Sequence, residues 1–278
     1  MTVLEVLQSS TAYFKKRKID NPRLNAEHLL AHVLNRKRLE LYLEFERELD
    51  EAELKPLRDL VRRRGEGEPL QYLLGTVEFC GHTFLCDKRA MVPRPETEEL
   101  VEFVKSEIRN PKSEILDVGT GSGVIALSLA AKFPEAEVHA VDVSDDALAL
   151  ARENATRLGL SERVCFAKGN LLEAIEGDFD LIVANLPYVS TQDRQSLSRE
   201  VLRDPEVALF AGERGDELVR RLIEQASAHL RPGGLLALEI GVDQSAALLS
   251  FLAEKNYDDI ASKSDYSSTT RFLFARYG

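Results

Sequence analysis

The sequence has few of the residues that build disulfide frameworks or metal sites. Its three cysteines, Cys80, Cys86 and Cys165, contain no C-x-x-C pair, and its five histidines are scattered along the chain. An odd number of separated cysteines does not indicate a disulfide framework, and no Cys or His cluster has the spacing of a zinc site. We therefore expect buried or incidental thiols and no bound metal.

Long apolar runs are also missing. Hydrophobic residues make up 44% of the chain, yet no uninterrupted apolar stretch approaches the ~18 residues that a membrane helix needs. The first ten residues, MTVLEVLQSS, lack the basic-then-apolar pattern of a signal peptide. We expect a cytoplasmic protein without a membrane partner.

Basic residues are outnumbered by acidic ones. The chain holds 36 Lys and Arg against 47 Asp and Glu, a net charge of −11, which disfavours binding to nucleic acid through a broad basic face. Residues 1–66 hold 14 basic and 12 acidic residues, a net of +2, which leaves 22 against 35, or −13, for residues 67–278. This difference, and a length of 278 residues, favour one large domain and a smaller one.

The hydrophobic pattern divides the chain into three segments. Residues 1–66 have apolar residues at helical spacing, which predicts a small helical bundle. Residues 67–96 contain Gly, Pro and two short apolar pieces around Gly81-His82, which predicts a connector with a β-hairpin. From residue 97 to residue 278 strands and helices alternate, which predicts an α/β domain with an open, mostly parallel sheet. Its strands are expected at residues 114–118, 137–142, 163–167, 180–184, 234–240 and 271–276.

A glycine-rich turn follows the first of these strands and has the sequence Gly119-Thr120-Gly121-Ser122-Gly123. Glycines let the backbone approach a ligand closely, and the amino end of the next helix offers unpaired N–H groups. Asp142 ends the second strand, where an acidic side chain can accept hydrogen bonds from ribose hydroxyls. Together these features predict a nucleoside-binding site at the carboxyl ends of the strands.

Asp117, just before the glycine turn, indicates which nucleoside is bound. The spacing G-x-G-x-G lacks the third glycine of the dinucleotide fingerprint. A carboxylate at this position suits a ligand with a cationic amino acid tail, which points to S-adenosylmethionine. The alternative is that Asp117 only caps backbone amides of the loop. Asn170 and Leu171 follow the third strand, where adenine contacts are expected, although both are also ordinary turn residues.

The stretch Asn185-Leu186-Pro187-Tyr188 follows the apolar run of residues 181–184. The side-chain oxygen of Asn185 and the main-chain oxygen of Leu186 can accept the N–H bonds of an amide or arylamine. Held in this way, the nitrogen lone pair points at a transferable methyl group, so catalysis is mostly positioning and electrostatics. Pro187 would fix the turn and Tyr188 would cover the planar group. An ordinary turn at a strand end is the alternative.

With these residues in view, the chain resembles the release factor glutamine methyltransferases, the HemK/PrmC family of class I methyltransferases. The likeness covers nearly the whole length. Its most discriminating pieces are EPLQYLLG at residues 68–75 and PRPETE at residues 93–98, and it also includes Asn154-Ala155 and LEIG at residues 238–241. The resemblance implies a Rossmann-like seven-strand sheet. It also implies methyl transfer from S-adenosylmethionine to the side-chain amide nitrogen of the glutamine in the Gly-Gly-Gln motif of peptide chain release factors.

The resemblance assigns roles to individual residues. Cofactor binding falls to the glycine turn and to Asp117, Asp142, Asn170, Leu171 and Asn185. The residues that hold the glutamine, and thereby act in catalysis, are Asn185, Leu186, Pro187 and Tyr188. We also expect substrate contacts from Arg94 and Glu96 in the PRPETE piece. The N-terminal bundle would help to hold the release factor.

Two departures from the family pattern leave alternatives open. Leu186 stands where the family usually has a proline, and Asn170 stands where it has an aspartate. Asn-Leu-Pro-Tyr is also what ribosomal RNA adenine dimethyltransferases tend to carry, so an N6-adenine methyltransferase acting on RNA or DNA is the first alternative. The net charge and the two connector motifs argue against it. A glutamine methyltransferase for a ribosomal protein and a non-catalytic cofactor-binding module are the others.

Overall fold

The computed structural model describes residues 1–108, 110–173 and 175–278. The chain forms two compact units. The helical unit consists of Met1–Thr76 and Ser198–Arg203, and the sheet unit consists of Val77–Leu197 and Asp204–Gly278. The expected boundary at residue 66 thus lies within the helical unit, and a short segment from much later in the chain also belongs to that unit.

The helical unit is a bundle around one apolar core. Its helices are α1 (Val3–Lys16), α2 (Pro22–Leu34), α3 (Glu51–Gly65) and α4 (Leu70–Leu74), with the 3-10 helix η1 (Arg38–Leu43) between α2 and α3. Thr2 with Glu5 and Asp50 with Glu53 form capping boxes that satisfy the free N–H groups at the starts of α1 and α3. Leu73 of α4 is buried in the bundle core. This packing explains why the helical unit extends past residue 66.

Arg64 at the end of α3 explains why residues 198–203 belong to the helical unit. Its side chain is almost fully buried and donates to Asn25 Oδ1 at 2.7 Å, to the Glu68 main-chain oxygen at 2.9 Å and to Glu200 Oε2 at 2.6 Å. A buried guanidinium needs such partners because desolvation of an unpaired charge is costly. Glu200 therefore anchors its segment, which includes the 3-10 helix η3 (Val201–Arg203), to the bundle.

The sheet unit contains a seven-stranded sheet with the order β10-β11-β9-β6-β3-β4-β5. Its strands are β3 (Glu114–Val118), β4 (Glu137–Asp142), β5 (Val164–Lys168), β6 (Phe179–Asn185), β9 (Leu230–Glu239), β10 (Tyr257–Ser264) and β11 (Thr270–Tyr277). The strands from β9 to β5 are parallel to one another, and β11 is antiparallel to both β9 and β10. The predicted α/β class and seven-strand sheet are confirmed.

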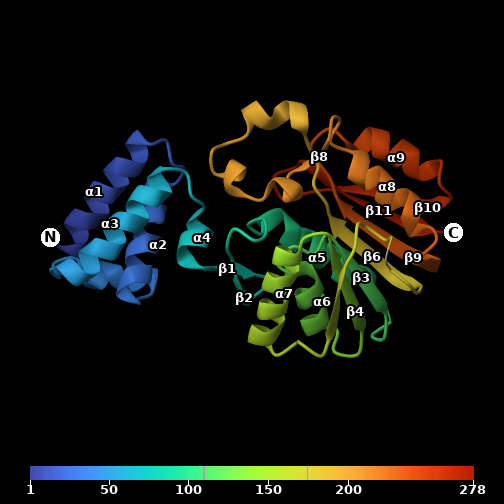
Figure 1. Ribbon diagram of the computed structural model, residues 1–278, viewed down its shortest axis with the longest axis horizontal. Helices are drawn as coiled ribbons and strands as arrows, with labels where there is room; N and C mark the ends of the chain where they lie inside the picture. Colours follow the sequence, from blue (N-terminus) through green and yellow to red (C-terminus); the bar gives the residue numbers. More distant parts are fainter. Residues whose placement is uncertain (109, 174) are drawn as a thin grey trace. The chain divides into compact units, whose positions relative to one another are not determined.

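Helices cover both faces of this sheet, as Figure 1 shows. Helices α5 (Pro95–Glu107), α6 (Val124–Lys132) and α7 (Asp145–Leu158) share one core with Ile115, Leu181 and other strand residues. Helices α8 (Glu217–Ala226) and α9 (Ser245–Ala253) share a second core with Leu116 and Ile182, the residues that follow Ile115 and Leu181 on the same strands. Successive side chains on a strand point to opposite faces, so these apolar strands bury both. In the described part of the chain no helix is both long and apolar enough to cross a membrane.

Shorter elements surround the carboxyl edge of the sheet. The predicted hairpin is present as β1 (Thr76–Phe79) and β2 (His82–Leu85). After β6 come β7 (Val189–Ser190), η2 (Thr191–Ser196), η4 (Glu206–Ala208) and β8 (Phe210–Gly212). The strand order reverses at β3, which pairs with β4 on one side and β6 on the other. Ligands of open α/β sheets bind at such a switch point.

Candidate active site

The glycine turn joins β3 to α6 in a conformation that side chains rarely adopt. Gly119, Gly121 and Gly123 all have positive φ, at 75°, 56° and 83°, which glycine reaches without steric cost. The Gly119 and Thr120 N–H groups both donate to the main-chain oxygen of Val141, at 2.8 and 3.0 Å. The turn is therefore fixed against the end of β4.

Asp142 at the end of β4 is tied to the same turn. Its Oδ2 accepts from the Gly121 N–H at 2.8 Å and its Oδ1 accepts from the Ser144 N–H at 2.9 Å. Burial raises the pKa of Asp142, and these backbone donors oppose the rise. The carboxylate is half-buried and held in one orientation, as a group that accepts hydrogen bonds from ribose hydroxyls would have to be.

Asp117 is fully buried beneath the turn. Its Oδ2 accepts from the Thr120 hydroxyl at 2.6 Å and from the Ala126 N–H at 3.1 Å, so Asp117 does brace the loop and the start of α6. Its Oδ1 has no hydrogen-bond partner within the described residues. Burial raises the pKa of Asp117 to about 7. A nearby cation would satisfy Oδ1 and lower this pKa.

A cavity of about 300 Å³ lies at the switch point, which is at the small end of the range for ligand pockets. Of the residues singled out in the sequence, those that line it are Gly119, Thr120, Gly121, Ser122, Asp142, Asn170, Leu171, Asn185, Leu186 and Pro187. Gly123, Asp117, Tyr188, Arg94 and Glu96 are not among the lining residues. The cavity thus has the glycine turn on one wall and the end of β6 on another.

The end of β6 presents the predicted acceptor pair. Asn185 is half-buried, and its Nδ2 donates to the Thr97 hydroxyl oxygen at 3.0 Å. Leu186 is only 4% exposed and packs in the apolar core that carries α8 and α9. A Cβ added to Gly119 would lie 2.8 Å from the Leu186 Cδ2 atom. Leu186 therefore packs directly against the glycine turn.

Tyr188 is half-buried beside the cavity. Its main-chain oxygen accepts from Gln244 Nε2 at 3.1 Å. Burial and the carboxylate of Glu239 raise the pKa of the Tyr188 hydroxyl to about 12. The phenol is therefore neutral at physiological pH. Its contact with a planar substrate stays a prediction.

Arg94 and Glu96 lie beside the cavity without lining it. Arg94 Nη2 forms an ion pair with Asp204 Oδ2 at 2.6 Å, and Asp204 Oδ1 accepts from the Val92 N–H at 3.2 Å. Asp204 is buried and precedes Pro205, Val207 and Ala208, which line the cavity. Arg94 therefore positions a wall of the cavity through Asp204. Glu96 is half-buried on α5, and a substrate contact for either residue stays a prediction.

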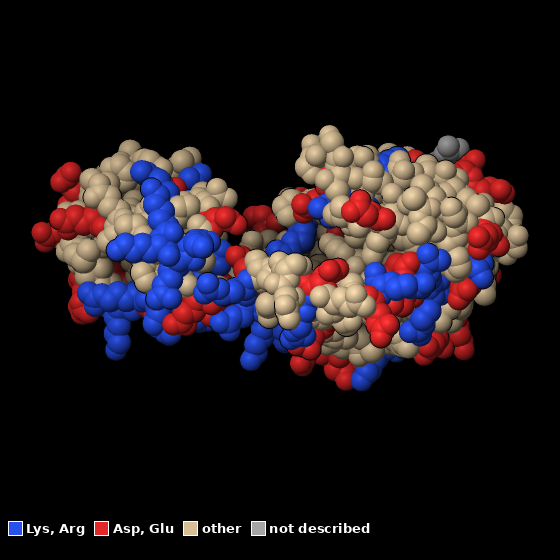
Figure 2. Space-filling model, turned by 90° about the horizontal axis from the view of Figure 1, so that it is seen from above, with Lys and Arg blue, Asp and Glu red and all other residues tan. Residues whose placement is uncertain are grey.

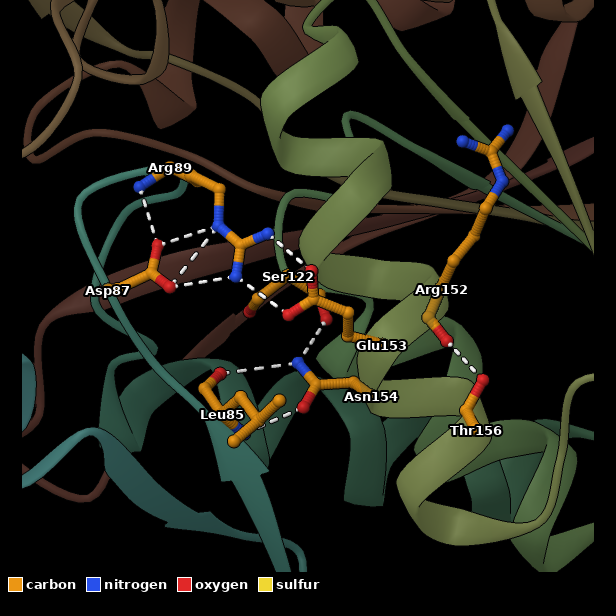
Figure 3. Close-up of polar contacts among 8 residues, drawn as sticks. All are labelled: Leu85, Asp87, Arg89, Ser122, Arg152, Glu153, Asn154 and Thr156. Atoms are coloured by element: carbon orange, nitrogen blue, oxygen red, sulfur yellow. Dashed lines mark hydrogen bonds and ion pairs between the residues drawn. The ribbon is translucent and has the colours of Figure 1, made fainter.

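Asn154 connects the hairpin to the glycine turn. It is fully buried on α7, its Oδ1 accepts from the Leu85 N–H at 2.6 Å, and its Nδ2 donates to the main-chain oxygens of Leu85 at 3.2 Å and Ser122 at 2.9 Å (Figure 3). Arg89 lies nearby, lines the cavity and pairs with both Asp87 and Glu153. The family motif Asn154-Ala155 thus acts on the cavity through backbone contacts.

Sequence reasoning missed two buried residues next to Asn185. Thr97 on α5 is 3% exposed and donates its hydroxyl hydrogen to Glu239 Oε2 at 2.8 Å, and Glu239 is 2% exposed. Both lie inside motifs already noted for the family resemblance, PRPETE and LEIG. Their position in these motifs was therefore the available signal, although neither residue itself had an assigned role.

The fold and the cavity together define a class I methyltransferase. The strand order has the topology of this class, and the glycine turn after β3, Asp142 at the end of β4 and Asn185 at the end of β6 line one cavity at the switch point. A solved structure supports this class: the ribosomal protein L11 methylase from Lactobacillus delbrueckii subsp. bulgaricus matches with a TM-score of 0.50 and 25% identity, over 66% of this chain and 79% of that chain.

Relatives narrow the class to a family. The model of the PrmC N-terminal domain matches residues 5–75 and the model of the methyltransferase small domain matches residues 95–212. The release factor glutamine methyltransferase of Chlorobaculum tepidum is 40% identical over 98% of this chain and 96% of its own length. That of Deinococcus radiodurans is 41% identical over 99% of both. The chain belongs to the release factor glutamine methyltransferase family.

The chain is therefore an enzyme that uses S-adenosylmethionine as its methyl donor. The residues present fit this cofactor. Asp142 offers a fixed carboxylate to a ribose, Leu171 offers a buried apolar side chain, and Asp117 has an oxygen that a cation would satisfy. Within the described ranges, no group of three or more His, Cys, Asp or Glu side chains has the arrangement of a metal site.

Proposed function

We propose that this protein transfers a methyl group from S-adenosylmethionine to the side-chain amide nitrogen of the glutamine in the Gly-Gly-Gln motif of peptide chain release factors. One observation carries the proposal at the level of the site. The glycine turn and Asp142 line the same cavity as Asn185, Leu186 and Pro187. A nucleoside methyl donor and a flat carboxamide acceptor can therefore meet in this cavity.

The carboxamide of a glutamine is a weak nucleophile because its nitrogen lone pair is delocalised into the carbonyl group. When bound, S-adenosylmethionine supplies an electrophilic methyl group on a sulfonium. We assign the Asn185 Oδ1 atom and the main-chain oxygen of Leu186 as acceptors for the two N–H bonds of the substrate amide. These acceptors orient the nitrogen toward the methyl group and stabilise the positive charge that develops on it. The S–CH3 bond would break as the N–CH3 bond forms, S-adenosylhomocysteine would leave, and the methylated nitrogen would then lose one proton to solvent.

The remaining assignments concern binding. The backbone of the glycine turn and Asn170 and Leu171 would contact the cofactor, and Asp142 would hold its ribose. Asp117 would interact with the cationic amino acid tail of the cofactor. Pro187 would fix the conformation of the turn that holds the acceptor oxygens, and Tyr188 would cover the substrate amide. Each role is consistent with the position of the residue in or beside the cavity.

The helical unit would help to hold the release factor. Its surface carries many basic side chains (Figure 2), although the whole chain is acidic. The exposed ones are Lys15, Lys16, Arg17, Lys18, Arg23, Arg36, Lys37, Lys55, Arg58, Arg62, Arg199 and Arg203. Because release factors act in translation termination, we propose that the protein works in the cytoplasm. We propose no nucleic acid partner.

A transfer assay tests this proposal. The protein is incubated with labelled S-adenosylmethionine and one of three candidate substrates in separate reactions. The candidates are a release factor, a variant of that release factor in which the Gly-Gly-Gln glutamine is alanine, and ribosomal RNA. Label in the release factor but not in its Gln→Ala variant is the expected result. Label in RNA alone would replace the proposal with the adenine methyltransferase, and label in no substrate would favour a non-catalytic module.

A further inference from the structure

Three residues from three elements form a hydrogen-bonded chain that ends in the cavity. Asn185 ends β6, Glu239 ends the neighbouring strand β9, and the two are register partners in the parallel pair. Thr97 lies in the first turn of α5. Its hydroxyl donates to Glu239 Oε2 at 2.8 Å and accepts from Asn185 Nδ2 at 3.0 Å.

The carboxylate of Glu239, at the buried end of this series of hydrogen bonds, fixes which group donates and which accepts in each bond. An ionised carboxylate only accepts hydrogen bonds, and a threonine hydroxyl has a single hydrogen to donate. With that hydrogen given to Glu239, the Thr97 oxygen has only lone pairs left to offer. Asn185 must then turn its NH₂ group toward Thr97, because the opposite orientation would place two acceptor oxygens against each other.

We propose that Thr97 and Glu239 are positioning residues that hold the Asn185 carboxamide with its oxygen toward the substrate. This inference rests on the proposed function, because it takes Asn185 Oδ1 as the acceptor of a substrate N–H. A flipped Asn185 would present its own N–H groups to the N–H groups of the substrate, and the nitrogen would not be held. The two residues act through Asn185 and need no contact with the reacting atoms.

The variant Glu239→Gln would remove this bias without changing the shape of the side chain. The amide introduced by this change could donate to Thr97, whose hydroxyl could then donate to Asn185 in the flipped orientation. A fall in kcat in Glu239→Gln would therefore report a change in hydrogen-bond direction and not a change in side-chain packing. Thr97→Val removes the hydroxyl with nearly the same volume, and Thr97→Ser keeps the hydroxyl while it removes a methyl group.

The charge of Glu239 gives a second readout. Burial raises the pKa of Glu239 to about 7. The hydrogen bond from Thr97, the charge of Arg271 on β11 and the side chain of Asn185 oppose the rise, and Glu96 on α5 adds to it. Tyr188 also faces this carboxylate, but its own pKa is raised to about 12. A protonated Glu239 can donate to Thr97 and permits both orientations. Methyl transfer should therefore rise with pH through about 7.

The experiment measures kcat, KM for a release factor and the calorimetric affinity for S-adenosylmethionine. In Thr97→Val and Glu239→Gln we expect kcat to fall by about 10- to 100-fold with cofactor affinity kept within about threefold. Thr97→Ser should restore kcat to within about threefold of the wild-type value. An unchanged kcat in Thr97→Val and Glu239→Gln, or equal losses in Thr97→Val and Thr97→Ser, would overturn the proposal.

The wild-type pH profile needs no substitution and covers the case in which a variant does not fold. At saturating cofactor we expect kcat to rise through about pH 7, and the rise should vanish in Glu239→Gln. A wild-type kcat that is flat between about pH 5.5 and 8.5 would contradict the positioning role. If the wild-type protein does not methylate the release factor at all, the proposed function fails and not this inference alone.

Discussion

The Cδ2 methyl group of Leu186 lies so close to Gly119 that a Cβ at position 119 would come within 2.8 Å of it. We assign Leu186 to the acceptor pair and Gly119 to the cofactor turn, and both line the cavity. The two parts of its wall therefore pack directly on each other. Leu186, one of the two positions at which the chain departs from its family pattern, is therefore part of the core and also lines the cavity.

Replacing Leu186 with proline separates these two roles. The main-chain oxygen at position 186 is kept and the turn becomes more rigid, so we expect kcat to stay the same or rise. The buried leucine side chain is lost, so the free energy of unfolding in urea should fall by about 1–3 kcal/mol. Leu186→Ala is the control that loses the packing without gaining rigidity. A large fall in kcat for Leu186→Pro at unchanged fold would show that the acceptor turn is misassigned.

Gly119→Ala tests the contact from the other side. Alanine at this position has an unfavourable positive φ and a close contact with Leu186. Gly159 at the end of α7 is the matched control, since its φ is +70° and nothing lies within 4 Å of an added Cβ. We expect Gly159→Ala to cost about 1–2 kcal/mol in stability and to leave cofactor affinity unchanged. Gly119→Ala should cost more and weaken cofactor binding, and equal effects of the two changes would refute the contact.

Asn154 should be one of the most sensitive positions outside the cavity lining. Asn154→Ala removes the bridges to Leu85 and Ser122 (Figure 3) and leaves buried backbone groups unpaired. We expect a loss of about 2–4 kcal/mol in urea unfolding, with weaker cofactor binding. Thr156→Ala on the same helix removes only exposed hydroxyl contacts, with the Arg152 main-chain oxygen and with Ser161 Oγ, and should cost less than about 0.5 kcal/mol. Similar losses in both variants would contradict the bridging role.

Cofactor binding should release protons from Asp117. Burial raises the pKa of this carboxyl to about 7, and a bound cation lowers it, so the group loses its proton on binding. At pH 7 we expect release of about half a proton, and affinity that rises with pH until it levels off above 7. Calorimetry in two buffers of different ionisation enthalpy measures the release. Asp117→Asn should abolish it; release that persists in this variant would assign the proton to another group.

The same group affects stability without cofactor. Because the folded pKa of Asp117 is raised, the folded state binds more protons than the unfolded state between about pH 4 and pH 7. Its contribution to the free energy of unfolding is therefore present at low pH and lost as pH rises toward 7. Asp117→Asn should flatten this part of the stability profile.

The sequence predicts the sheet well where strands are apolar on both faces. Residues 114–118, 137–142 and 180–184 coincide closely with β3, β4 and β6, because short segments rich in Val, Ile, Leu and Ala and bounded by turns are typical of buried parallel strands. Strand β10 was not among the strands expected from residue patterns. It is an edge strand whose side chains are mostly exposed, so its sequence lacks the apolar pattern.

The site was predictable where function depends on local sequence. The glycine turn follows β3 directly, Asp142 ends β4 and Asn185 ends β6. Parallel strands bring these ends to one edge of the sheet. The links through Thr97 to Glu239 and through Arg64 to Glu200 join residues separated by 142 and 136 positions. Such pairings depend on tertiary packing, which no local pattern contains.

The most direct test of the account compares two quantities in Asn185→Ala, with a release factor as methyl acceptor. If Asn185 holds the glutamine carboxamide, the rate of transfer should fall by about 100-fold or more. The calorimetric affinity for S-adenosylmethionine should stay close to the wild-type value. Equal losses of rate and affinity would make Asn185 a cofactor-binding residue, and an unchanged rate would contradict the central claim that this side chain orients the substrate nitrogen.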